Sequence, residues 1–223
     1  MLGDRPYGIS PEHARYMAKE IKKVHDRGVQ IAVVVGGGNF IRGADTALHG
    51  IDETTAHYMG MLAMVINALA LQANLEALEV PTRVQTAIHM EEVAEPYIRR
   101  RAIRHLEKGR VVIFAAGTGN PFFTSDTAAA LRAAEIDADV ILMAKHGVDG
   151  VYDADPKLDK SAKKFSELDY NDVLRQKLRV MDATAAALAN EQKISTIVFD
   201  LNDPDTLQRA VMGERVGTLV RSG

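Results

Sequence analysis

Three consecutive glycines follow an apolar run near the N-terminus. Residues 36–38 are glycines that come directly after the valines at 33–35, and Arg42 stands four residues further on. Because glycine has no Cβ, the backbone N–H groups of such a run can converge on an anion, and an arginine can add a charge-assisted bond to a phosphate. The alternative is a tight surface turn with a solvated arginine. The spacing is not that of a P-loop.

The segment of residues 116–126 is the most distinctive in the chain, and it also follows an apolar run. It contains two glycines, an asparagine and three hydroxyl residues, with Phe122 and Phe123 among them. A helix that begins after such a loop offers free backbone N–H donors to a phosphate, and the two rings could pack against a base or a ribose. In the alternative, both rings are core residues and Thr124 or Ser125 only caps the helix. The density of polar groups in one loop favours the binding function.

A third loop, residues 145–156, follows another strand-like run. Its glycines permit sharp turns, Tyr152 could meet an adenosine, and the carboxylate of Asp155 could meet a magnesium-bound phosphate. A surface turn rich in aspartate and glycine has the same composition, so this segment does not indicate a site by itself.

Helix and strand patterns alternate along the chain. Ser10 is predicted to cap a helix that has Pro11 at its first position, and Gly28 is predicted to end it. Further helices are predicted over residues 54–78, from about Pro96, after Asp126, after residue 164 and from Pro204. The predicted strands cover residues 31–35, 82–88, 111–115, 140–144, 196–199 and 217–220. The run at 31–35 is apolar throughout, which predicts a strand buried on both faces.

This alternation predicts an α/β fold, a three-layer αβα sandwich with a central, mainly parallel sheet. Residues 1–223 are predicted to form a single domain, with a softer boundary near residue 150. In open sheets of this kind, ligands bind beyond the carboxyl ends of the strands, which is where the three loops stand in the sequence.

Composition excludes several classes of function. The formal net charge is -3, so the chain has no global positive field to attract nucleic acid or an anionic membrane surface. The absence of cysteine excludes disulfides, thiolate metal sites and cysteine nucleophiles, and it fits a reducing compartment. No apolar run approaches the length of a membrane span, so a cytoplasmic protein is expected.

Two other groups of residues are predicted to be structural. Met59, Met61 and Met64 lie at helical spacing and are more typical of core filling than of a cofactor site. The arginines within residues 99–104 form a basic patch, which a solvated or subunit-facing surface explains more simply than an anion site.

Several motifs occur together and in one order. They are G-G-G-N-x-x-R-G at 36–43, M-G-M-L-A at 59–63, T-G-N-P-F-F-T at 118–124, V-D-G-V-Y at 148–152 and V-M-G-E at 211–214. In this order they resemble the bacterial uridylate (UMP) kinases of the amino acid kinase superfamily, and the resemblance covers essentially the whole chain. The segment at 118–124 separates this branch from acetylglutamate and aspartate kinases.

The resemblance implies an amino acid kinase-like fold and transfer of the γ-phosphoryl group of ATP to UMP, with Mg²⁺, to give UDP and ADP. It also implies a homohexamer that responds to GTP and UTP. The attacking group would be a phosphate oxygen of UMP, which is already anionic, so no side-chain base would be needed. Catalysis would consist of aligning two polyanions and neutralising the charge between them.

The resemblance further implies roles for the residues at matching positions. The residues that would hold UMP are Gly37, His57, Thr118, Gly119, Asn120, Pro121, Phe122, Phe123, Thr124 and Ser125. The residues on the ATP side would be Gly38, Arg42, His146, Tyr152 and Asp155. Asp126 and Arg42 would organise the charged centre, and no residue is assigned as a metal ligand.

Two of these positions depart from the family pattern. The family usually has an aspartate where this chain has His57, and that carboxylate holds the ribose hydroxyls. Histidine can still form hydrogen bonds, but the carboxylate acceptor is gone. His146 stands where relatives have asparagine or threonine near the adenosine.

A third departure concerns the start of the chain. The family opens with a strand that ends in Lys-x-Ser-Gly, and residues 1–3 align just beyond it, so we expect this first strand to be missing from the sequence. We expect either a start placed at an internal methionine or a shortened chain, with weak or absent turnover from these residues alone. The alternative is a non-catalytic nucleotide-binding or regulatory protein. The loop at 118–125 disfavours a relative that phosphorylates a carboxylate.

Overall fold

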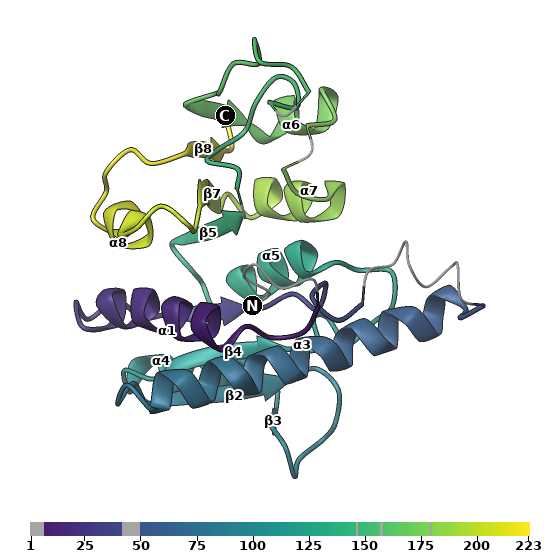
Figure 1. The fold of residues 1–223 in the computed structure, drawn as a ribbon, viewed down its shortest axis with the longest axis vertical. Coiled ribbons are helices and arrows are strands. Elements are labelled where there is room, and N and C mark those ends of the chain that lie inside the picture. Colours follow the sequence, from purple (N-terminus) through teal and green to yellow (C-terminus); the bar gives the residue numbers. More distant parts are fainter. Residues whose placement is uncertain (1–6, 42–49, 146, 157, 179) are drawn as a thin grey trace. The chain divides into compact units, whose positions relative to one another are not determined.

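The computed structural model describes residues 7–41, 50–145, 147–156, 158–178 and 180–223. The chain divides into two compact units, Met1–Ala128 and Ala129–Gly223. Helices and strands alternate in each unit and most of the paired strands are parallel, so the predicted α/β class with a mainly parallel sheet is confirmed (Figure 1).

The described part of the first unit contains a four-stranded sheet with the order β1-β4-β2-β3, in which the paired strands are parallel. Its strands are β1 (Ala32–Val34), β2 (Thr82–Thr86), β3 (Glu95–Pro96) and β4 (Val111–Ala115). Its helices are α1 (Pro11–His25), α3 (Glu53–Glu76), α4 (Arg99–Glu107) and the start of α5 (Ser125–Glu135), which continues into the second unit.

Strand β4 forms the centre of the first unit. All of its residues are buried, and it pairs with β1 on one side and with β2 on the other. Helix α3 runs along this sheet and packs on β2 and β4, while α1 packs on α3 and α4 packs on β4 (Figure 1). Because β1, β2 and β4 are parallel, the loops that follow them leave the sheet at the same edge.

Strand β1 is less buried than its sequence predicts. Ala32 is exposed, Val33 and Val34 are only partly buried, and burial becomes complete at Val35, so the prediction of a strand buried on both faces is wrong. Within the described residues, β1 pairs with β4 alone. An edge strand has a neighbour on one side only, which leaves part of its surface open.

Helix starts follow their capping signals where such signals exist. Ser10 Oγ accepts a hydrogen bond from the N–H of His13 at 3.2 Å, and α1 begins at Pro11 as predicted. The helix predicted from about Pro96 begins at Arg99 instead, and its N-cap makes no side-chain hydrogen bond. Pro96 belongs to β3, the edge strand beside β2, where a residue without an N–H is tolerated.

Helix α3 is long and apolar enough, by length and composition, to cross a membrane, with a mean hydropathy of 1.4 over its most apolar window. The expectation that no apolar run approaches the length of a membrane span is therefore corrected. Length and composition alone do not assign α3 to a membrane, because the core helix of a water-soluble protein can share them. The packing of α3 on α1, β2 and β4 is that of a core helix.

The described part of the second unit contains a sheet with the order β5-β7-β8-β6, in which β7 and β8 are antiparallel and the other pairs are parallel. Its strands are β5 (Val140–Lys145), β6 (Glu167–Asp169), β7 (Ser195–Asp200) and β8 (Thr218–Arg221), and its helices are α6 (Tyr170–Arg175), α7 (Ala183–Glu191) and α8 (Thr206–Val211).

The core of the second unit surrounds Tyr170. This residue is fully buried, and its hydroxyl donates to the carbonyl of Ile194 at 2.8 Å. The short strand β6, which precedes Tyr170, is absent from the predicted elements. Three residues are too few to show a period, and Glu167 and Asp169 have low strand propensity, so β6 depends on its pairing with β8.

Candidate functional site

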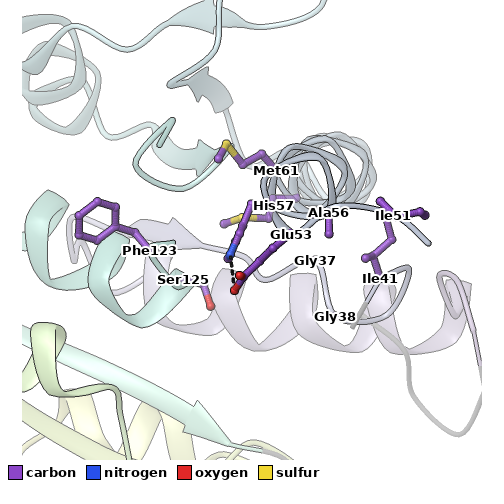
Figure 2. Close-up of a pocket in the computed structure, with 12 residues that line it drawn as sticks. Gly37, Gly38, Ile41, Ile51, Glu53, Ala56, His57, Met61, Phe123 and Ser125 are labelled. Carbon is purple, nitrogen blue, oxygen red and sulfur yellow. Dashed lines mark ion pairs between the residues drawn. The ribbon is translucent and has the colours of Figure 1, made fainter. Parts of the chain in front are cut away.

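A cavity of about 530 Å³ opens in the first unit, beside the loops that follow β1 and β4 (Figure 2). Its walls come from the glycine loop after β1, the N-terminal half of α3 and the segment that leads into α5. The lining residues are Gly37, Gly38, Ile41, Ile51, Glu53, Ala56, His57, Gly60, Met61, Met64, Phe123 and Ser125. Cavities of this size are typical of sites for small molecules.

Gly37 lies so close to α3 that it has no room for a side chain. A Cβ atom on Gly37 would lie 2.5 Å from the carbonyl oxygen of Gly60 and 3.1 Å from the Cβ of Ala63. Any larger residue would push the loop away from the helix. Gly37 is also buried, whereas Gly36 and Gly38 are exposed, so the glycine run is held against α3 at its middle residue.

His57 forms the wall of the cavity between α3 and the loop after β4. Its ring centroid lies 4.9 Å from that of Phe122, with the two planes inclined at 58°. Its Nε2 is 3.9 Å from Oε1 of Glu53, which precedes it by one helical turn. Figure 2 shows both side chains pointing from α3 toward the space beside Gly37 and Ser125. The imidazole can therefore offer a hydrogen bond to a ligand there, next to the apolar face of Phe122.

The two phenylalanines of the loop after β4 are exposed. Phe122 is 63% exposed and Phe123 is 48% exposed, which rules out the alternative in which both are core residues. Phe122 also has a positive φ of 69°, which costs free energy for a residue with a Cβ. Two exposed rings on a strained loop beside a cavity are typical of a binding loop.

The hydroxyl of Thr124 caps helix α5. Its Oγ1 accepts hydrogen bonds from the N–H groups of Asp126 and Thr127, at 3.1 and 3.3 Å. Thr124 therefore performs the capping role that the alternative gave it. Ser125, the next residue, reaches the cavity instead, and a Cβ on Gly36 would lie 3.7 Å from its Oγ.

The first half of this loop lies beside the end of β2. A Cβ on Gly119 would approach the carbonyl oxygen of Ala87 to 3.0 Å, and Gly119 has a positive φ of 78°. Thr118 Oγ1 accepts the N–H of Asn120 at 3.2 Å, which closes a local turn. These residues and Pro121 stand next to the lining of the cavity in the sequence but are not part of that lining.

In the second unit, Tyr152 belongs to a small polar cluster. Lys164 Nζ donates to Oδ2 of Asp149 and the hydroxyl of Tyr152 donates to Oδ1, each at 2.7 Å. The hydrogen bond from Lys164 and then that from Tyr152 hold the pKa of Asp149 below its usual value. The same bond to Asp149 raises the pKa of the Tyr152 hydroxyl. Tyr152 is thus held in one orientation on its loop.

The structure brings together only part of the predicted site. Around the cavity it gathers Gly37, Gly38, His57, Phe123 and Ser125, and it places Phe122 against His57. Asp126 follows Ser125 in the first turn of α5 and is partly buried. Tyr152 and Asp155 belong to the second unit, and Arg42 and His146 lie outside the described residues.

One wall of the cavity is missing from the sequence prediction. It is a face of α3 formed by Glu53, Ala56, Gly60, Met61 and Met64. Met61 and Met64 are buried, as predicted, but they also line the cavity. A signal for this wall was present in the sequence. The five residues and His57 follow one another at helical spacing, so all of them lie on the same side of the helix.

The sequence model described as the amino acid kinase family matches residues 3–200 of this chain. The match runs through both units.

Solved structures extend this finding. The chain is similar to the UMP kinase of Bacillus anthracis, with a TM-score of 0.96 and 41% identity over 99% of this chain and 91% of that one. It is similar to the UMP kinase of Ureaplasma parvum, with a TM-score of 0.91 and 38% identity over 96% and 91% of the two chains. It is also similar to the uridylate kinase of Archaeoglobus fulgidus, with a TM-score of 0.75 and 34% identity over 95% and 93%.

Proposed function

Since this chain belongs to the amino acid kinase family, we propose that it is a UMP kinase, a phosphotransferase that moves the γ-phosphoryl group of ATP to UMP and releases UDP and ADP. The identity of 41% and 38% to two bacterial UMP kinases, over nearly the whole chain, supports this activity.

The observation that carries the proposal is the cavity of the first unit. Gly37, His57, Phe123 and Ser125 come from three separate segments of the sequence, and all four line this one space. The glycine loop supplies backbone N–H donors suited to a phosphate, and Ser125 in the first turn of α5 supplies a hydroxyl. The exposed phenylalanine rings and the apolar face of α3 supply surfaces suited to a base. This combination fits a nucleoside monophosphate.

The reaction places few chemical demands on the side chains. A phosphate oxygen of UMP attacks the γ-phosphorus of ATP, and the bond from that phosphorus to the bridging oxygen breaks, so ADP leaves. The attacking oxygen is already anionic, so no side chain needs to remove a proton. The residues of the site have to align the two phosphate groups, exclude water and offset negative charge.

ATP and Mg²⁺ complete the proposed reaction. Among the described residues, no group of three carboxylate or histidine side chains is arranged to hold a metal ion. Mg²⁺ is usually bound through phosphate oxygens with the help of one or two carboxylates. We propose that Asp126 and Arg42 organise the charged centre, and that Gly38, Arg42, His146, Tyr152 and Asp155 bind ATP. Bound Mg²⁺ would offset charge on the transferred group.

We also propose that the protein is a cytoplasmic homohexamer that responds to GTP and UTP, and that residues 1–223 act as one domain. The family match across both units supports a single domain. An exposed apolar stripe on α3, formed by Tyr58, Leu62 and Ile66, supports self-association, because such surface is usually covered by a partner.

The direct test is a measurement of ADP release from ATP in the presence and absence of UMP. We expect release to depend on UMP, to be weaker with CMP and to be absent with acetylglutamate, a carboxylate acceptor. Wild-type protein that neither binds UMP nor releases ADP in its presence would contradict the proposal.

A further inference from the structure

Two asparagine side chains connect the glycine loop to helix α3. Asn67 of α3 is fully buried, and its Nδ2 donates to the carbonyl oxygen of Gly36 at 2.7 Å. Its Nδ2 also donates to Oδ1 of Asn39 at 2.5 Å, and Nδ2 of Asn39 donates back to Oδ1 of Asn67 at 2.9 Å. Asn67 thus uses both of its N–H groups and its carbonyl oxygen to hold this loop.

Asn39 is fixed in turn by the segment before α1. Its Nδ2 donates to the carbonyl oxygen of Gly8 at 2.8 Å, and its own backbone carbonyl accepts the N–H of Gly8 at the same distance. The side chain of Asn39 therefore cannot rotate without breaking several hydrogen bonds. The two side-chain amides are thus hydrogen-bonded to each other, to Gly36 through Asn67 and to Gly8 through Asn39.

These bonds determine the orientation of the peptide between Gly36 and Gly37. In a trans peptide the C=O and the N–H point in opposite directions, so a carbonyl of Gly36 held by Asn67 directs the N–H of Gly37 away from Asn67. The next carbonyl, that of Gly37, accepts the N–H groups of Phe40 and Ile41 at 3.0 and 3.2 Å. Two successive carbonyls are thus occupied within the protein. Because glycine has no Cβ, the peptide plane between two glycines can flip about the flanking φ and ψ angles with little steric hindrance. Without such bonds this loop could turn a carbonyl oxygen toward the cavity.

We propose that Asn67, supported by Asn39, is a positioning residue for substrate binding: it holds the Gly36–Gly37 peptide in the orientation in which the N–H of Gly37 donates to the phosphate of the bound nucleotide. This inference rests on the proposed function. It assigns a specific role to a residue that does not line the cavity, and the role concerns the phosphate group alone.

The test compares the affinity of the protein for UMP with its affinity for uridine, which lacks the phosphate. In the Asn67→Asp variant the carboxylate still accepts from Asn39 but cannot donate to Gly36. The dissociation constant of UMP should rise about tenfold or more, since hydrogen bonds that involve charged groups contribute about 1.5–3 kcal/mol each. The dissociation constant of uridine should change less than about twofold, because no bond to the base or ribose is altered.

Asn74→Asp is the matched control. Asn74 lies on the same helix, and its Nδ2 donates to the carbonyl of Ala70 at 2.8 Å, so the same chemical change removes a similar bond away from the loop. It should lower the thermal midpoint and leave the ratio of the two dissociation constants unchanged.

Should Asn67→Asp fail to fold, Asn39→Ala provides the second variant. Its side chain is only partly buried, and the variant should lower the preference for UMP about threefold or more, because Asn67 loses both of its hydrogen bonds to Asn39.

Three results would bear on the inference in different ways. Suppose that wild-type protein binds UMP more tightly than uridine, and that the ratio of the two dissociation constants is the same in Asn67→Asp or Asn39→Ala. The inference is then wrong and the proposed function stands. If the variants lose affinity for uridine and UMP in the same proportion, Asn67 supports the fold only, and the inference is also wrong. If wild-type protein binds UMP no better than uridine, the proposed function itself is contradicted.

Discussion

At the scale of single residues, two neighbouring glycines, Gly37 and Gly60, line the cavity, and each has a different reason to be glycine. Gly37 has no room for a Cβ, because the carbonyl of Gly60 would lie 2.5 Å from it. A Cβ on Gly60 would meet no atom within 4 Å, although Gly60 lies inside α3 and lines the cavity. A glycine inside a helix is about 1 kcal/mol less favourable than alanine, so an open glycine at this position suggests that a ligand approaches it closely.

Replacement of Gly60 by alanine should separate stability from binding. Gly60→Ala should raise the free energy of unfolding by up to about 1 kcal/mol, because alanine favours the helix. It should also raise the KM for UMP roughly tenfold, because a methyl group in a filled site costs about 1–3 kcal/mol. Thermal unfolding and steady-state kinetics measure the two effects, with the KM for ATP as the control. A more stable variant with an unchanged KM for UMP would show that the nucleotide does not approach Gly60.

At the scale of elements, β3 and α4 are joined by a partly buried hydrogen bond between His105 and Glu95. His105 Nε2 of α4 lies 2.9 Å from Oε2 of Glu95 in β3, and Gln85 Nε2 of β2 donates to the same oxygen at 3.2 Å. Arg110 donates to Nδ1 of His105 at 3.0 Å, so the proton of a neutral ring is on Nε2 and points at Glu95. Burial by itself would raise the pKa of Glu95, but the hydrogen bonds from His105 and Gln85 outweigh it, and the pKa lies below its usual value.

This lowered pKa predicts how stability depends on pH. A carboxyl group whose pKa is lower in the folded state stabilises the fold above its usual pKa, here 4.5, and loses that effect as the pH falls through the lower folded value. Glu95→Gln should therefore lower the thermal midpoint by about 2–4 °C at pH 7, and the difference from wild type should shrink as the pH falls below 4.5.

Thermal melts between neutral and acid pH would measure this effect, and Glu107→Gln serves as its control. Glu107 is half exposed and pairs with Arg104 on the surface of α4, so its replacement should change the midpoint by less than about 1 °C at any pH. A pH-independent difference for Glu95→Gln would show that Glu95 does not titrate as argued.

At the scale of the whole molecule, α3 has more apolar surface than one chain covers. Tyr58, Leu62 and Ile66 recur every four residues along it, and they are 46%, 50% and 48% exposed. They lie on the side of the helix opposite Met64, Asn67 and Leu71, which are buried. An apolar stripe of this length on a core helix is a surface that a second subunit could bury.

A charge in this stripe should prevent self-association. Leu62→Glu should reduce the molar mass measured by sedimentation equilibrium or light scattering, because a carboxylate buried in an apolar interface costs several kcal/mol. Leu158→Glu is the matched control, since Leu158 is 87% exposed on a loop of the second unit and its replacement should leave the mass unchanged. If the mass of Leu62→Glu equals that of wild type, the α3 stripe does not mediate assembly.

Much of the fold could be predicted from local signals. Ser10 and Pro11 mark the start of α1, and the run at 111–115 is a buried central strand as expected. The failures occurred where tertiary position overrides local propensity. The apolar β1 is only partly buried because it lies at an edge of its sheet, and Pro96 belongs to a short edge strand instead of starting a helix.

The sequence by itself determined the alternation of helices and strands, the loops that carry the chemistry and the family to which they belong, because each of these depends on residue types close together in the chain. Only the tertiary structure decided which loop residues share one cavity. It placed Gly37 against Gly60, His57 beside Phe122, and Asn67 under the glycine loop. Such contacts depend on strand order and on the side of α3 that faces the sheet, and neither is encoded in the local pattern of residues.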